Sequence, residues 1–188
     1  MSIKASETVT PEFFEHLVNS HGLGHDGFHG KDHWLRVLVN ARQIAAETGA
    51  NLRVVELFAV LHDSQRKNED HDPAHGHRAA VYAIQLRGKW FEASDAEMDL
   101  LVEACSYHSD GLTEAHATVQ ACWDADRLDL GRVGILPDPK HLCTPYAKRP
   151  EIIDAAYRRS INDEVHSQQI GKSPKLVQEH NFGLGGLF

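Results

Sequence analysis

The stretch Glu56-Leu57-Phe58-Ala59-Val60-Leu61-His62-Asp63 decides the fold, because an apolar run ends there in a histidine followed by an aspartate. Asn51 is expected to cap this helix, whose buried face delivers His62 and Asp63 at its C-terminal end. A buried carboxylate without a partner is costly, so both side chains need something to satisfy them. A divalent cation would do so, and its remaining ligands should lie elsewhere in the chain.

Length and composition indicate one globular domain over residues 1–188, because 188 residues with 41% hydrophobic side chains can bury a single core. The formal net charge is -8 and no basic run is present, which argues against duplex nucleic acid as a partner. A small anionic substrate remains compatible with this charge if a metal supplies the positive charge. The sequence leaves the oligomeric state open, and an oligomer is possible.

The chain holds no run of about 18 uncharged apolar residues, so no membrane partner is expected. Residues 1–7 lack the apolar core of a signal peptide, and we expect a cytoplasmic protein. The three cysteines are odd in number and form no C-x-x-C pair, which predicts neither a disulfide nor a zinc finger.

The periodic segments of the chain all predict helices, and no alternation of apolar residues predicts a strand. The fold class is therefore expected to be all-α. The expected helices cover about residues 11–18, 32–48, 52–63, 73–86, 95–108, 114–130 and 150–169. Their boundaries are marked by Thr10 with Pro11, by Gly49, by Asn51, by Asp72 with Pro73 and by a capping box at Ser94 and Glu97. Residues 131–147 are expected to form an ordered loop, and residues 181–188 a loose tail.

Nine of the 14 histidines precede residue 78, and several of the fourteen fall at helix ends. His33 is expected in the first turn of its helix, and His108 at the end of another. His75 and His77 cannot face the same way, because they lie about 200° apart around one helix. A single histidine at any of these positions would more often be structural than a metal ligand.

Other polar residues are expected to be solvated. His21, His25 and His29 fall in or beside a glycine-rich loop. On the late helix, Asp126 lies beside the apolar side, whereas Asp124 and Asp129 are expected to face water.

Taken in order, these residues resemble the H…HD…D signature of the HD superfamily of metal-dependent phosphohydrolases. The matches are His33, the doublet His62-Asp63, and Asp126, and they span about residues 29–135. The resemblance implies an HD-type helical bundle in which these four residues hold a divalent ion.

Two further matches resemble the segments that two-metal members of the superfamily add. His75 and His108 would then hold a second ion, with Asp63 bridging the two. His77 is the competing ligand, and His75 is preferred on motif register. Imidazole and carboxylate ligands suit Mn, Fe, Co, Ni or Zn without choosing between them, so the expected cofactor is one or two of these divalent ions per chain.

The resemblance implies hydrolysis of a phosphoester or phosphoanhydride bond in a small phosphorylated substrate, such as a nucleotide or cyclic nucleotide. Metal-activated hydroxide would attack phosphorus, with Asp63 and Arg66 as catalytic residues. Some single-metal nucleotidases of the superfamily carry an acid three positions after the doublet, where this chain has Arg66. We therefore expect Arg66, together with Lys67, to clamp phosphate.

Other cations near these motifs are weaker candidates for substrate binding. Arg36 and Arg127 could either contact the substrate or pair with surface carboxylates. Arg78 and Arg132 have a still weaker claim.

Two other functions stay open at this point. Some two-iron HD proteins are oxygenases that activate O₂ at the same six-ligand site, and they would act on a small organic substrate. A non-catalytic nucleotide-binding regulatory domain with the same fold is the other alternative.

Overall fold

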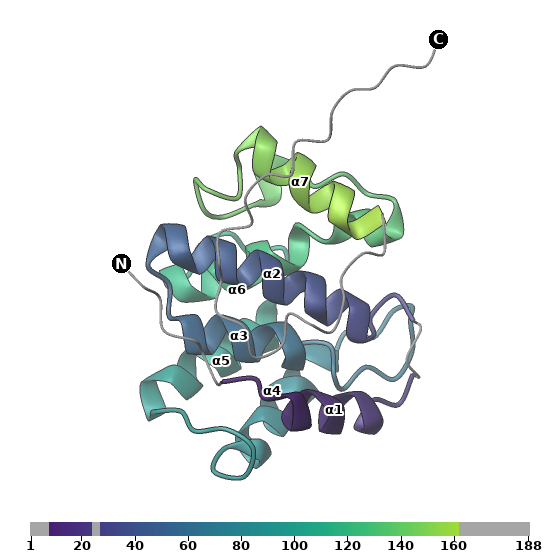
Figure 1. Ribbon diagram of the computed structural model, residues 1–188, viewed down its shortest axis with the longest axis vertical. Helices are drawn as coiled ribbons and strands as arrows, with labels where there is room; N and C mark the ends of the chain where they lie inside the picture. Colours follow the sequence, from purple (N-terminus) through teal and green to yellow (C-terminus); the bar gives the residue numbers. More distant parts are fainter. Residues whose placement is uncertain (1–7, 24–26, 162–188) are drawn as a thin grey trace.

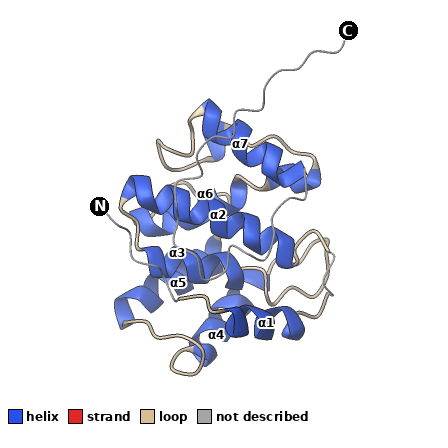
Figure 2. Ribbon diagram, in the orientation of Figure 1, coloured by secondary structure: helices blue, strands red, loops and turns tan. Residues whose placement is uncertain are grey.

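The computed structural model describes residues 8–23 and 27–161, and these residues form an all-α bundle, as the sequence predicts. Within these ranges there is no strand, and the nearest approach to one is an isolated bridge between Arg87 and Phe91 (Figure 2). The elements are α1 (Pro11–Ser20), α2 (Lys31–Thr48), α3 (Leu52–Leu61), α4 (His75–Leu86), α5 (Asp95–Tyr107), α6 (Ala117–Arg127), the 3-10 helices η1 (Leu130–Val133) and η2 (Pro139–His141), and α7 (Pro150–Ile161).

Helix α3 lies at the centre of the bundle. Every residue from Val54 to Leu61 is buried, so the helix is enclosed on all sides rather than amphipathic. It packs between α2 and α6 on one side and α5 on the other, with α1 and α4 also in contact (Figure 1). The next two residues after α3, His62 and Asp63, therefore enter the interior of the molecule.

Four of the predicted helix boundaries are confirmed by capping interactions. Thr10 Oγ1 accepts a hydrogen bond from the backbone N–H of Phe13, and Asn51 Oδ1 accepts one from Val54. The capping box at Ser94 and Glu97 has both of its hydrogen bonds. Gly49 ends α2 with φ at 74°, a conformation that glycine adopts without strain.

Two predicted helix starts are wrong. Helix α4 begins at His75 rather than at Pro73, because the Asp72 carboxylate accepts hydrogen bonds from the backbone of Lys67 and the side chain of Arg78 instead of capping the helix. Helix α6 begins at Ala117 rather than near Glu114, with the His116 side chain accepting a hydrogen bond at its N-terminus. It ends at Arg127, and the chain tightens into η1 three residues later.

The expectation that Asp124 is solvated is also wrong. Its side chain is fully buried and accepts hydrogen bonds from the backbone N–H groups of Cys143 and Thr144 and from the Thr144 hydroxyl, at 2.6 to 2.7 Å. Asp124 thereby fastens the predicted loop, which contains η1 and η2, to α6.

The last described helix, α7, packs on η1 and α2. It ends at Ile161 in the described part of the chain, so the predicted continuation to about residue 169 and the predicted loose tail at residues 181–188 lie outside the described residues. None of the described helices has the length and apolar character needed to cross a bilayer. All three cysteines are free thiols, and Cys105 and Cys122 are buried.

Candidate metal centre

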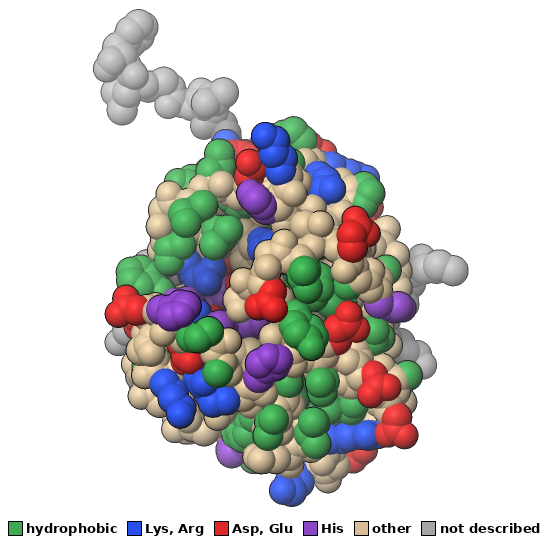
Figure 3. All heavy atoms as spheres, turned by 180° about the vertical axis from the view of Figure 1, so that it is seen from behind, with side chains coloured by type: hydrophobic (Ala, Val, Ile, Leu, Met, Phe, Trp, Pro, Cys, Tyr) green, Lys and Arg blue, Asp and Glu red, His purple; other side chains and the backbone are tan. Residues whose placement is uncertain are grey.

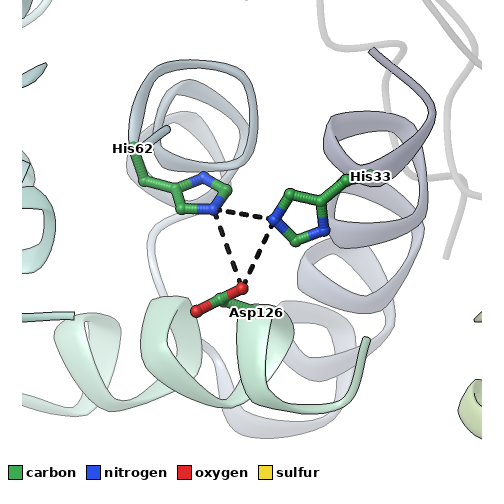
Figure 4. Close-up of side chains that lie close together, drawn as sticks. All are labelled: His33, His62 and Asp126. Carbon is green, nitrogen blue, oxygen red and sulfur yellow. Dashed lines mark hydrogen bonds and ion pairs between the residues drawn. The ribbon is translucent and has the colours of Figure 1, made fainter. Parts of the chain in front are cut away.

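Three helices bring His33, His62 and Asp126 together inside the bundle (Figure 4). His33 comes from the first turn of α2, His62 is the C-cap of α3, and Asp126 lies in the last turn of α6. The Nε2 atoms of the two histidines are 3.1 Å apart, and Asp126 Oδ1 lies 3.4 Å from His33 Nε2 and 3.7 Å from His62 Nε2. The ligand atoms of all three residues thus face one point.

A second pair of histidines lies on the other side of Asp63. His75 is the first residue of α4, and His108 is the C-cap of α5. Their Nε2 atoms are 2.8 Å apart and lie 3.2 Å and 3.6 Å, respectively, from Asp63 Oδ1.

The two carboxylate oxygens of Asp63 face different histidine pairs. Oδ1 faces His75 and His108, whereas Oδ2 lies 3.7 Å from the Nε2 atom of His33 and 3.7 Å from that of His62. Asp63 is 2% exposed, so this carboxylate lies between the two pairs with almost no contact with water.

All six sequence-predicted metal ligands are therefore brought together. The structure also separates the two candidates on α4: His75 is buried in the cluster, whereas His77 is exposed and its ring lies against that of Tyr107. Motif register identified the histidine that faces the site.

Each of the four histidines has an acceptor for its other ring nitrogen. Nδ1 of His62 is 3.1 Å from the Phe58 carbonyl oxygen, and Nδ1 of His108 is 2.8 Å from that of Cys105. The Asp72 carbonyl accepts from His75 Nδ1, and the Asp129 carboxylate from His33 Nδ1. A proton held on each Nδ1 leaves the Nε2 lone pair directed at the cluster, as in metal sites.

This tautomer creates a conflict that a cation would resolve. Two Nε2 lone pairs that face each other at 2.8 or 3.1 Å repel one another, since neither nitrogen can donate. Asp126 Oδ1 is also buried without a hydrogen-bond partner. Two nitrogens bound about 2.1 Å from one ion at an angle of about 90–110° are about 3.0–3.4 Å apart, close to the distances in both pairs. The donor set fits a divalent ion.

Burial governs the ionisation of the cluster. Desolvation lowers the pKa of His33 and lowers that of His62 to about 4, which keeps both imidazoles neutral. Desolvation acts the same way on His108, but the hydrogen bond to Asp63, the charges of Asp63 and Asp126 and the hydrogen bond to the Cys105 carbonyl together outweigh it and raise the His108 pKa. Burial opposes the charge on Asp63, yet the surrounding histidines hold its pKa well below the usual value.

Sequence reasoning missed Asp129, which it expected to be solvated. Asp129 is 1% exposed, and its carboxylate accepts hydrogen bonds from His33 Nδ1 and Arg36 Nε, both at 2.7 Å. The spacing of these residues could have indicated the contact. His33 and Arg36 are three residues apart on α2, and Asp126 and Asp129 are also three residues apart in the sequence. Side chains three residues apart share a helix face, so the two pairs could have been matched.

Two arginines lie beside the cluster. Arg66 Nε is 3.1 Å from Asp63 Oδ1, in agreement with its predicted place at the site. Arg132, which sequence reasoning ranked among the weakest candidates, has its Nη2 atom 3.8 Å from Asp126 Oδ1. Its position follows from η1, a 3-10 turn that helical periodicity did not predict.

The structure does not support Arg36 and Arg127 as substrate-binding residues. Arg36 is 4% exposed and its guanidinium binds Asp129, while Arg127 donates hydrogen bonds to the carbonyl oxygens of Leu112 and His141. Both side chains are thus occupied in holding the bundle together. Lys67 is exposed, and its backbone N–H binds Asp72.

Two of the loop histidines were predicted to be solvated, and the structure shows both to be buried. His29 is 8% exposed, its Nδ1 is 2.6 Å from Glu69 Oε2, and its ring contacts that of His33. His21 is also 8% exposed and contacts the Ser64 carbonyl. His25, the third of this group, lies outside the described residues.

A scan against models of protein families, a search of curated proteins and a search of solved structures each gave no match for this chain.

Proposed function

We propose that this chain is a metal-dependent hydrolase of phosphoester or phosphoanhydride bonds in a small substrate, such as a nucleotide or cyclic nucleotide. The observation that carries the proposal is the Asp63 carboxylate, which directs one oxygen to each of two buried histidine pairs. Bridging carboxylates of this kind join paired metal ions in hydrolases that act on phosphate groups. The resemblance of the motif order to the HD superfamily points to the same reaction.

In this proposal the six ligands hold two ions. His33, His62, Asp126 and Oδ2 of Asp63 would hold one, and Oδ1 of Asp63 with the His75 and His108 pair would hold the other. Neutral imidazoles and carboxylates suit Mn, Fe, Co, Ni and Zn.

Bound ions would supply an activated water molecule and positive charge for the phosphoryl oxygens. The chain's own residues prepare this site: Asp129 holds the His33 ring in the tautomer that presents Nε2, and the carbonyls of Phe58 and Cys105 do the same for His62 and His108. No protein nucleophile is required.

One guanidinium group, that of Arg66, would bind the anionic substrate, whereas the Arg132 guanidinium is held by the Phe28 and Asp129 carbonyl oxygens at the edge of the cluster. Arg66 lies beside Asp63, and Arg132 lies beside Asp126. Figure 3 shows Lys or Arg and His side chains together in a hollow on the left of that view. Bound ions, together with Arg66, would supply the positive charge for a small phosphorylated substrate, even though the whole chain carries a formal charge of -8.

The proposal is tested by stripping the protein with a chelator, reloading it with Mn²⁺, Zn²⁺, Co²⁺ or Ni²⁺, and screening mononucleotides, cyclic nucleotides and dinucleotides. We expect hydrolysis that depends on added metal and proceeds without O₂, with ¹⁸O from labelled water appearing in the phosphate of the product. Turnover that requires iron and O₂ would contradict the proposal in favour of an oxygenase. Absence of turnover across the panel in fully metal-loaded protein would contradict any catalytic function in this substrate class.

A further inference from the structure

Four large apolar side chains are exposed on two segments that meet at Arg132. They are Phe28 at 58% exposure, Val133 at 42%, Ile135 at 53% and Leu136 at 62%. We call these four residues the apolar rim. Exposed apolar side chains are ordinary when scattered, but a group beside a polar site is typical of ligand binding.

Arg132 connects the apolar rim to the candidate metal centre. Its Nε donates a hydrogen bond to the Phe28 carbonyl oxygen at 3.1 Å, its Nη1 donates to the Asp129 carbonyl oxygen at 3.1 Å, and its Nη2 lies 3.8 Å from Asp126 Oδ1. One side chain thus fixes the Phe28 segment, the start of η1 and the edge of the ligand cluster relative to one another.

The other half of the rim is also held in place. Val133 is the last residue of η1, and the Ile135 N–H donates to the Leu130 carbonyl oxygen at 3.1 Å. Apolar side chains border the hollow that contains the Lys or Arg and His side chains in Figure 3. The rim is therefore a preformed surface, and binding a ligand to it costs little ordering of the backbone.

We propose that the apolar rim binds an apolar or aromatic group attached to the phosphate of the substrate, which makes Phe28, Ile135 and Leu136 specificity-determining residues. The inference rests on the proposed function, since the phosphate lies at the metal centre beside Arg132 and Arg66. The substrate class becomes phosphate esters or anhydrides whose second part has a flat or apolar face, in preference to small polar phosphates.

The test is calorimetric titration of Mn²⁺-loaded protein with inorganic phosphate, methylphosphonate and phenylphosphonate, which contain no ester bond to hydrolyse. Phenylphosphonate is expected to bind about tenfold more tightly than methylphosphonate, as burial of roughly 50 Å² of additional apolar area would give. In the double variant Phe28→Ser and Leu136→Ser this preference should disappear, while the affinity for methylphosphonate stays unchanged.

The control is the double variant Val81→Ser and Ile84→Ser, which removes apolar side chains of similar exposure, 55% and 56%, from α4. It should keep the full preference for the phenyl group. Equal affinities for both phosphonates in the unaltered protein, or an unchanged preference in the rim variant, would overturn the inference and leave the proposed function standing. Failure of all three anions to bind the metal-loaded protein would overturn both.

Discussion

Asp63 is the residue on which the site depends, because its two oxygens face two different histidine pairs while the side chain is almost fully buried. Single residues of this kind could be predicted from the sequence, since an aspartate after an apolar run has few ways to be satisfied. The other five candidate ligands were predictable through their order and motif register. Asp129 and Arg132 were not, because their roles depend on contacts between separate segments rather than on a local pattern.

The assignment of His75 rather than His77 can be tested with two variants on the same helix. His75→Ala should remove one ion per chain and lower turnover by at least about 100-fold, because it deletes a direct ligand. His77→Ala is the matched control, since this histidine is exposed, and it should leave metal content and turnover unchanged. Elemental analysis and turnover measurements check both, and the opposite pattern would exchange the two roles.

Arg66 is expected to bind substrate rather than to hold the metal. Arg66→Ala should raise KM for a phosphorylated substrate about tenfold through loss of a charge-assisted hydrogen bond, with the metal content unchanged. Arg66→Lys, which keeps the charge, should recover part of the loss. Steady-state kinetics with metal analysis on the same samples provide the measurement, and a parallel fall in bound metal would show that Arg66 supports the cluster instead.

At the scale of elements, apolar periodicity predicted the helices, and their caps predicted four boundaries. The starts of α4 and α6 were misplaced because the side chains of Asp72 and His116 form hydrogen bonds that differ from the expected capping pattern. Local side-chain hydrogen bonds can shift a helix start in this way. The close approach of α4 to α5 has no periodic signal in the sequence, and only the motif resemblance placed His75 and His108 together.

Gly76 permits this close approach. A Cβ atom there would collide with the Cys105 carbonyl oxygen and lie 3.2 Å from His108 Nδ1. Gly76→Ala should therefore push α4 from α5, lower the free energy of unfolding by about 1–3 kcal/mol and weaken binding of the ion held by His75 and His108. Urea unfolding and Mn²⁺ titration measure the two effects. Gly22→Ala, where a Cβ would meet nothing within 4 Å, is the control, and equal behaviour of the two variants would refute this role for Gly76.

At the scale of the whole molecule, the bundle buries a cluster of histidines and aspartates whose donor atoms could hold a divalent ion. The all-α class followed from the absence of strand patterns, whereas only one buried face was predicted for α3, which the structure encloses on all sides. The packing of α7 on η1 could not be predicted from the sequence, because contacts between these two segments leave no periodic signal.

Buried histidines should make the metal-free protein sensitive to acid. Burial lowers the His62 pKa from 6.5 to about 4, so between these values the unfolded chain binds a proton that the folded chain does not. The contribution of His62 to stability is therefore present above about pH 6.5 and falls as the pH is lowered, by about 2 kcal/mol at pH 5. The pKa of His108 is raised, so its contribution to stability grows as the pH is lowered and partly offsets the loss from His62.

This prediction is checked by urea unfolding in the presence of a chelator at pH 7 and pH 5, with His62→Gln as the comparison. The variant lacks the titrating group and should lose less stability between the two pH values than the unaltered protein. An identical loss in both proteins would mean that His62 does not titrate as its burial requires.

The ratio of bound metal to protein, measured by elemental analysis after free metal has been removed, tests the central claim most directly. The proposed bridged centre predicts two divalent ions per chain in the unaltered protein and almost none in Asp63→Ala, with helical circular dichroism retained in both. An unaltered protein that binds no divalent ion, or an Asp63→Ala variant that binds as much metal as the unaltered chain, would contradict it.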